Sequence, residues 1–205
     1  MSYYRDEARA YAASTQDVDM AALYARFVPL VPPGGRVLDA GCGSGRDARA
    51  FRALGFEVDA FDASPELAAI ASAHAGMDVQ VADFLSLTLA PGAYDAIWAC
   101  ASLLHVPEAE QADAWGRLWH GLKPGGVVYA SYKLGDDTRP AERTDSLGRP
   151  FTDGTEARLH GWLKGLTGLA RVDAWVTRDA AHREDVAWLN VLAYRCPNTV
   201  QAAGA

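Results

Sequence analysis

Residues 36–47 decide the fold, and they read Arg-Val-Leu-Asp-Ala-Gly-Cys-Gly-Ser-Gly-Arg-Asp. Arg36 to Ala40 form a short run preceded by Pro-Pro-Gly-Gly, which predicts a buried strand. Glycines at alternate positions follow, and helical spacing over 47–54 begins directly after them. Glycines let the backbone turn tightly and approach a ligand, while the free N–H groups of a helix start face the same ligand. The stretch therefore predicts a ligand-binding turn at the end of a buried strand.

Strands and helices alternate beyond this stretch. Further strands are predicted over 56–61, 79–82, 94–99 and 127–132, and helices from Ser64-Pro65, over 107–121 and from a capping box at 153–156 to about residue 166. The last strands, 169–177 and 186–195, have little sequence between them, which predicts an antiparallel pair. We expect an α/β, Rossmann-like fold with about seven strands, mostly parallel, an antiparallel C-terminal hairpin and helices on both faces.

Length and patterning predict one domain over residues 1–205. Within it we expect an N-terminal helical cap over 1–35, with a helix at about 17–27, and a frayed tail over 197–205. Residues 134–150 are polar, carry both charge signs and lack periodicity. A loop of this length is usually functional or disordered, so it is a candidate lid.

Composition excludes several functions. The net charge is −7 and no Lys/Arg cluster is visible, so a nucleic-acid partner is not expected. No apolar run reaches about 18 residues, so no membrane span is expected. Residues 1–10 contain charged residues and no apolar core stretch, so no secretory signal is expected. The three cysteines, Cys42, Cys100 and Cys196, are odd in number and widely spaced. They predict no disulfide framework and no metal site, and they favour the cytoplasm.

Acidic residues follow the first three strands. Asp39 lies two residues before the first glycine, where a carboxylate repels a pyrophosphate but suits the ammonium group of a methionine moiety. Asp62 ends the second strand, at the spacing typical of a ribose ligand. Asp83 and Phe84 follow the third strand and suit an adenine amino group and its ring. Arg46 stands where the dinucleotide fingerprint requires a further glycine.

The run from Val37 to Gly45, then Asp62, Asp83-Phe84, residues 98–101 and residues 122–126 together resemble the ordered motifs of class I S-adenosylmethionine-dependent methyltransferases. Residues 45–47 and 103–106 are similar to small bacterial members, including the tellurite-resistance type. The resemblance implies S-adenosylmethionine as cofactor and S-adenosylhomocysteine as product. The cofactor-binding residues that it implies are Asp39, Gly41, Gly43, Gly45, Arg46, Asp62, Ala63, Asp83, Phe84 and Ala99, with Arg46 facing the cofactor carboxylate.

Candidates for acceptor chemistry lie after the fourth and fifth strands. His105 is the best candidate for a general base, because an imidazole can be neutral near pH 7; its alternative is a structural hydrogen bond near a helix start. Tyr11 is a candidate lid or cation–π partner of a sulfonium, or an ordinary packing residue. Lys133, Arg143 and Arg149 could fix an anionic acceptor, or could belong to a solvated loop.

The sequence thus predicts a methyltransferase acting on a small molecule, as a monomer or homodimer. The acceptor atom stays open among oxygen, nitrogen, sulfur and heavier chalcogens. Residues 99–102 lack the Asn/Asp-Pro-Pro-Tyr/Phe segment typical of enzymes that methylate DNA bases. Two alternatives remain: an NAD-dependent oxidoreductase, against which Asp39 and Arg46 argue, and a cofactor-binding module without catalysis.

Overall fold

The computed structural model describes residues 7–145, 148–181 and 186–198, and its main feature is a seven-stranded sheet in the order β3-β2-β1-β4-β5-β9-β8. Strands β3, β2, β1, β4 and β5 are parallel, β9 is antiparallel to β5, and β8 is antiparallel to β9. The strands are β1 (Arg36–Ala40), β2 (Glu57–Asp62), β3 (Gln80–Val81), β4 (Tyr94–Ala99), β5 (Leu122–Lys133), β8 (Leu169–Arg178) and β9 (Ala187–Arg195). This topology confirms the predicted mixed sheet.

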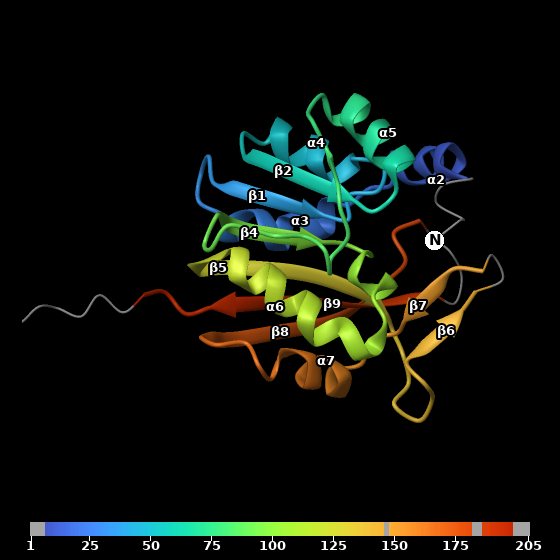
Figure 1. Ribbon diagram of the computed structural model, residues 1–205, viewed down its shortest axis with the longest axis vertical. Helices are drawn as coiled ribbons and strands as arrows, with labels where there is room; N and C mark the ends of the chain where they lie inside the picture. The colour runs from blue at the N-terminus through green and yellow to red at the C-terminus, as the bar shows by residue number, and fades with distance from the viewer. Residues whose placement is uncertain (1–6, 146–147, 182–185, 199–205) are drawn as a thin grey trace, which may run out of the picture.

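Helices cover both faces of the sheet. Figure 1 shows α6 and α7 in front of it and α3 behind it. The helices are α2 (Ala8–Thr15), α3 (Ala21–Phe27), α4 (Arg46–Ala53), α5 (Pro65–Ala75), α6 (Gln111–Gly121) and α7 (Glu156–Leu163), with 3-10 turns at Val28–Leu30, Leu103–His105 and Glu108–Glu110. Ser64 caps α5 by accepting from the Leu67 N–H, and Pro65 takes its first position, as predicted.

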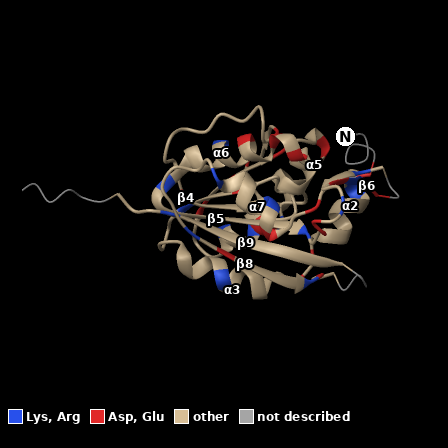
Figure 2. Cartoon of the chain, turned by 90° about the horizontal axis from the view of Figure 1, so that it is seen from below, with Lys and Arg blue, Asp and Glu red and all other residues tan. Residues whose placement is uncertain are grey.

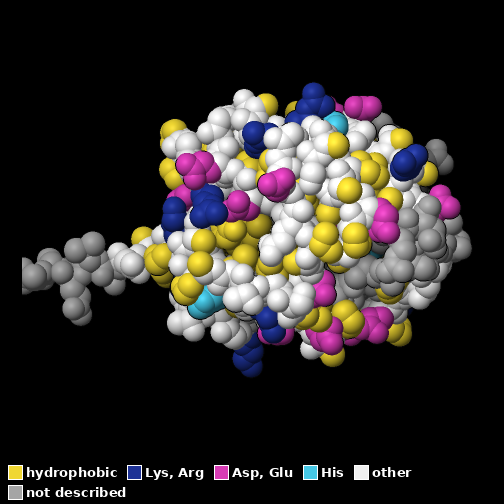
Figure 3. Space-filling view, turned by 45° about the horizontal axis from the view of Figure 1, so that its top comes forward, with side chains coloured by type: hydrophobic (Ala, Val, Ile, Leu, Met, Phe, Trp, Pro, Cys, Tyr) yellow, Lys and Arg dark blue, Asp and Glu magenta, His cyan; other side chains and the backbone are white. Residues whose placement is uncertain are grey.

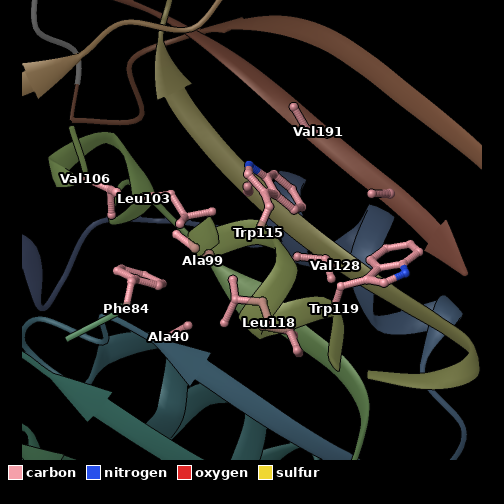
Figure 4. Close-up of a cluster of buried hydrophobic side chains, with 14 of the residues drawn as sticks. Ala40, Phe84, Ala99, Leu103, Val106, Trp115, Leu118, Trp119, Val128 and Val191 are labelled. Atoms are coloured by element: carbon pink, nitrogen blue, oxygen red, sulfur yellow. The ribbon is translucent and has the colours of Figure 1, made fainter. Parts of the chain in front are cut away.

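Alternation along β1 separates two cores. Leu38 and Ala40 join the core beneath α6 and α7, which also holds Trp115 and Trp119 (Figure 4). Val37 belongs to the core beneath α3 and α4, where α3 contributes Phe27. Because side chains alternate along a strand, Asp39 lies on the same face as Val37. The buried carboxylate at the end of β1 is therefore placed next to α3 and α4.

The strand order reverses at β1, whose neighbours β2 and β4 leave in opposite directions along the sheet. In sheets of this kind, ligands bind beyond the carboxyl ends of the strands at that point. In Figure 1 the arrowheads of β1 and β2 point toward the side of the molecule where α2 and the hairpin of β6 (Glu142–Thr144) and β7 (Pro150–Thr152) lie. The polar residues that follow β1, β2 and β4 therefore lie at the same edge of the sheet as α2 and this hairpin.

The structure differs from the sequence prediction in the segment 134–150. It is not without regular structure, because β6 (Glu142–Thr144) pairs antiparallel with β7 (Pro150–Thr152). The pairing joins two three-residue segments across a turn, and such short segments carry too little period for sequence detection.

Two helix starts also differ. Thr155, not Asp153, caps α7 by accepting from the Arg158 N–H, and the N-terminal cap contains α2 besides α3, which begins at Ala21 rather than near residue 17. Asp153 instead pairs with Arg143 at 2.6 Å. Thr155 competes well for the cap position because its hydroxyl reaches the N–H three residues on.

Charges of both signs intermingle on the surface. In Figure 2 the Lys and Arg residues are spread over several elements, and in Figure 3 acidic, basic and apolar side chains alternate on the face in view. Among the residues that the structure describes, no helix has the length and apolar character needed to cross a bilayer.

Candidate functional site

Two chambers meet at the carboxyl edge of the sheet. The first has a volume of about 550 Å³ and the second about 520 Å³, and each is large enough for a small organic molecule. Residues shared by both linings are Tyr11, Gly41, Gly43, Ala101 and His105. A ligand in the first chamber therefore reaches the second one past this shared set.

Predicted residues from two strand ends, those of β2 and β3, line the first chamber: Asp62, Ala63, Asp83 and Phe84. Asp62 accepts from the Gly43 N–H at 2.8 Å and from the Ser64 N–H at 2.9 Å, so it ties the glycine turn to the start of α5. Burial raises the pKa of Asp62, although these two N–H donors oppose the shift.

Asp83 and Phe84 differ in exposure. Asp83 accepts from the backbone N–H groups of Ser86 and Leu85, and the first of these bonds leads in holding the pKa of this exposed carboxyl below its usual value. Phe84 is buried and packs edge-to-face on Phe61 at 5.2 Å, so its ring forms a fixed wall that continues into the core (Figure 4). The pair presents one exposed carboxylate, held by backbone N–H groups, and one buried apolar surface.

The glycine turn is shaped by close contacts as well as by backbone angles. A Cβ on Gly41, whose φ is +73°, would stand 2.5 Å from the Ser102 Cβ. Gly45, whose φ is +76°, lies against α5, where a Cβ would stand 2.9 Å from the Ala71 Cα. Gly45 lines neither chamber, so among the described residues its requirement for glycine is explained by helix packing. Ala99 is fully buried in the core.

Asp39 lies beneath the glycine turn and is 2% exposed. Its Oδ2 atom is buried and has no hydrogen-bond partner among the described residues. Burial, followed by repulsion from Asp47, raises the pKa of Asp39 well above its ordinary value, while Arg46 and the Ala48 amide oppose the shift. Asp39 lines neither chamber; its unpartnered oxygen lies behind the turn and would be satisfied by a cationic donor that reaches it.

Arg46 lies at the second chamber, and its guanidinium is held by the neighbouring Asp47. Its Nε donates to Asp47 Oδ1 at 2.7 Å and one Nη to Oδ2 at 2.8 Å. The Trp98 indole N–H and the Tyr24 hydroxyl donate to the same carboxylate. Arg46 could therefore contact a cofactor carboxylate, as predicted, only through those N–H groups of its guanidinium that do not bond to Asp47.

His105 ends the 3-10 turn after β4 and lines both chambers. Its Nδ1 lies 2.9 Å from the Pro150 carbonyl oxygen, which can only accept, so Nδ1 carries the proton and Nε2 is the basic nitrogen. Burial lowers the pKa of His105 to about 4; the Pro150 bond opposes the shift, and Arg149 and Lys133 add repulsion. The imidazole is neutral near pH 7.

Lys133 and Arg149 line the second chamber beside His105, and Arg143 does not. The Lys133 ammonium lies 3.9 Å above the Phe151 ring, and the Arg149 guanidinium lies 5.2 Å from it. Arg149 also pairs with Asp145 at 2.6 Å. Arg143 contributes to a third, smaller cavity of about 260 Å³, which shares His105 and Phe151 with the second chamber.

Tyr11 comes from α2 and faces the glycine turn. A Cβ on Gly43 would stand 3.4 Å from its ring, so the ring lies directly over the turn. Burial, followed by the Asp62 charge, raises the pKa of Tyr11 to about 12, so its hydroxyl stays protonated. Burial likewise raises the pKa of the Cys100 thiol to about 12, so the thiol stays protonated near pH 7 and is not an activated nucleophile.

Sequence reasoning missed several residues of the site. Ser102 donates to the Ala40 carbonyl at 2.7 Å, and Ala101 is the non-glycine residue with a positive φ, +52°, in the described part of the chain. Backbone strain of this kind is common at functional sites. Three further residues were missed because their partners are distant in sequence: Phe151, Tyr24 and Trp98. The one local signal for this cluster was the adjacent pair of opposite charges, Arg46 and Asp47. No group of three potential metal ligands occurs among the described residues.

Comparisons with known proteins agree with this arrangement. A family model described as a methyltransferase domain matches residues 37–126. A ubiquinone biosynthesis O-methyltransferase of Xanthomonas campestris pv. campestris is 38% identical over 106 residues, which cover 48% of this chain and 43% of that protein. The chain thus spans less than half the length of the first curated relatives that it matches.

A longer match is to the ubiquinone biosynthesis O-methyltransferase of Xylella fastidiosa, 32% identical over 177 residues that cover 82% of this chain and 68% of that protein. A Burkholderia thailandensis 1,6-didemethyltoxoflavin-N1-methyltransferase, solved with S-adenosylhomocysteine, has a TM-score of 0.74 at 22% identity and covers 95% of this chain and 84% of its own. These relatives do not single out the tellurite-resistance type. The chain belongs to the class I S-adenosylmethionine-dependent methyltransferases.

Proposed function

We propose that the chain transfers a methyl group from S-adenosylmethionine to a small-molecule acceptor. The observation that carries the proposal is the pair of chambers that meet at Gly41, Gly43, Ala101, His105 and Tyr11. A two-substrate reaction needs two adjoining sites that share a boundary at the reacting atoms. The first chamber fits a nucleoside, and the second an acceptor of similar volume.

The residues present fit the cofactor. The unpartnered Asp39 oxygen suits its ammonium group, Asp62 suits the ribose hydroxyls, and Asp83 with Phe84 suits adenine. Gly41 and Gly43 leave the backbone of the turn open to it, whereas Gly45 and Ala99 act through packing behind the site. The cofactor supplies an activated methyl group and a neutral thioether leaving group. The chain's own tasks are to align the two ligands and to exclude water.

His105 holds the proton-accepting role in this proposal. Its Nε2 is the basic nitrogen, and Pro150 fixes the plane of the ring from the other side. An acceptor hydroxyl that must lose its proton can pass it to Nε2. The names of the relatives as O-methyltransferases support an oxygen acceptor first, and nitrogen, sulfur and chalcogen acceptors, including the tellurite-resistance type of substrate, remain arms of the test.

Lys133 and Arg149 suit an acceptor that carries an acidic group. Both residues line the second chamber, and the positive charge of each lowers the pKa of His105. The positive potential of both therefore reaches the imidazole. An anion bound there would offset that repulsion. Phe151 beneath both cations offers an apolar face to the rest of the acceptor. Arg143 lies outside this chamber and is not part of the proposed acceptor site.

The test is a screen for S-adenosylhomocysteine release with small acceptors in matched pairs, each acid beside its amide or methyl ester. We expect turnover with hydroxylated aromatic or aliphatic acids and little with their neutral partners. Binding of NAD without binding of S-adenosylhomocysteine would establish the oxidoreductase alternative. Tight S-adenosylhomocysteine binding with no turnover on any acceptor would favour a non-catalytic module.

Assembly and location remain proposals as well. We propose a monomer or homodimer in the cytoplasm, supported by three free cysteines that suit a reducing compartment. Sedimentation equilibrium of the full chain tests the assembly, and fractionation of the source cells tests the location.

A further inference from the structure

Two buried carboxylates compete for one guanidinium behind the glycine turn. Asp39 at the end of β1 and Asp47 in the first turn of α4 are 2% and 6% exposed. Burial removes the water that would solvate either charge, and repulsion from Asp47 adds to the cost of ionising Asp39. Arg46 is the cation that both sense: it lowers the pKa of Asp39 and the pKa of Asp47.

Asp47 holds Arg46 with an unusually complete set of bonds. Both of its oxygens accept from the guanidinium, at 2.7 and 2.8 Å. The same oxygens also accept from Tyr24 on α3 and from Trp98 on β4, the latter at 2.8 Å. Burial alone would raise the pKa of Asp47, but Arg46 and these hydrogen bonds hold it below its ordinary value. Donors from two other elements, α3 and β4, therefore join Arg46 in keeping Asp47 charged.

Asp39 accepts fewer hydrogen bonds than Asp47 does. The Ala48 amide is the hydrogen-bond donor that opposes its raised pKa, and its Oδ2 has no partner among the described residues. The other charged group facing it is Asp62, which makes the local field more negative. Among the described residues, Asp47 therefore has a paired cation, whereas the Oδ2 atom of Asp39 has no partner.

We propose that Asp47 is a positioning residue that keeps Arg46 away from Asp39, and thereby reserves Asp39 for the ammonium group of an amino-acid-tailed nucleoside. This inference rests on the proposed function, in which that nucleoside is S-adenosylmethionine. If Asp47 lost its charge, Arg46 would be free to pair with Asp39. The site would then be neutralised from within, and a ligand ammonium would have to displace an internal ion pair.

The experiment is titration calorimetry with two ligands that share the nucleoside: S-adenosylhomocysteine, and 5′-methylthioadenosine, which lacks the amino-acid tail. We expect Asp47→Asn to weaken S-adenosylhomocysteine binding at least tenfold and to change 5′-methylthioadenosine binding less than twofold. In the double variant Asp47→Asn/Arg46→Gln the competitor for Asp39 is gone. We therefore expect S-adenosylhomocysteine affinity to recover at least fivefold over that of Asp47→Asn.

A second readout counts protons. Repeating the titration near pH 7 in buffers of different ionisation enthalpy should show proton release when S-adenosylhomocysteine binds to the wild type and none with Asp39→Asn. If Asp47→Asn does not fold, as judged by thermal unfolding, Tyr24→Phe replaces it and should weaken S-adenosylhomocysteine binding twofold or more without affecting 5′-methylthioadenosine.

Three results would overturn the inference. The first is an equal loss of affinity for both ligands in Asp47→Asn, and the second is no recovery of S-adenosylhomocysteine affinity in the double variant. The third is a Tyr24→Phe protein that binds S-adenosylhomocysteine as tightly as the wild type does. Failure of the wild type to bind either ligand is a different outcome, because it would refute the proposed function itself.

Discussion

The Nδ1 atom of His105 lies 2.9 Å from the carbonyl oxygen of Pro150, so the hairpin β6–β7 sets the tautomer of the imidazole that borders both chambers. The bond joins residues 45 positions apart. It converts a segment that has no detectable period in the sequence into a support for the site. Through this bond the hairpin fixes the orientation of the imidazole ring.

Replacing His105 separates its two roles. His105→Ala removes both the base and the Pro150 bond, whereas His105→Asn keeps an amide donor for Pro150 and lacks a base. If His105 accepts the acceptor's proton, both variants should lose about a hundredfold in kcat on a hydroxyl acceptor. S-adenosylhomocysteine affinity, measured by calorimetry, should stay within a few-fold. Full turnover by His105→Asn would show that orientation of the hairpin is the role that matters.

The pH dependence of stability should carry a contribution from His105. Its pKa is near 6.5 in the unfolded chain and about 4 in the folded one. Between these values the unfolded chain binds the extra proton, so stability present above pH 6.5 is lost as pH falls toward 4. The loss is roughly 2 to 3 kcal/mol. Urea unfolding at pH 7 and pH 4.5 should show a smaller loss in His105→Asn than in the wild type; equal losses would contradict the shift.

Gly45 should tolerate no side chain. A Cβ there would be strained by the φ of +76° and would press on Ala71 at 2.9 Å. We expect Gly45→Ala to lower the free energy of unfolding by about 3 kcal/mol. Gly55→Ala is the matched control, because its φ is +88° but no atom lies within 4 Å. It should lose about 1 kcal/mol. Similar losses in both variants, measured by chemical denaturation, would show that the contact with α5 is unimportant.

Lys133 should matter for acidic acceptors alone. Lys133→Met keeps an unbranched side chain over Phe151 and removes the charge, so KM for an acidic acceptor should rise about tenfold. KM for its neutral amide should not change. Arg143→Met is the control, since Arg143 also lies 5.2 Å from the Phe151 ring but lines the third cavity. Steady-state kinetics measures these KM values. An equal rise of KM for the acidic acceptor in both variants would contradict an anion-binding role of Lys133.

Sequence patterns were sufficient where the signal is local. The run from Arg36 to Asp47 contains the strand, the turn and the helix start within twelve residues, and Ser64-Pro65 contains a complete N-cap. The mostly parallel sheet with an antiparallel C-terminal pair followed from the alternation of elements, whereas the strand order came from the structure. The hairpin β6–β7 was not predicted because its three-residue strands are too short to show a period. The cap at Thr155 was not predicted because the competing candidate, Asp153, is paired with Arg143 in the structure.

What the sequence by itself determined is the fold class, the family and the acidic residues at the strand ends, because each is carried by residues close together in the chain. What only the tertiary structure decided is how those residues are used. Arg46, expected to face a cofactor carboxylate, is committed to Asp47 by Tyr24 and Trp98 from two other elements, and His105 takes its tautomer from Pro150. The physical reason is that the charge state and direction of a buried polar group depend on every group packed around it, and those neighbours come together only when the sheet and its helices assemble.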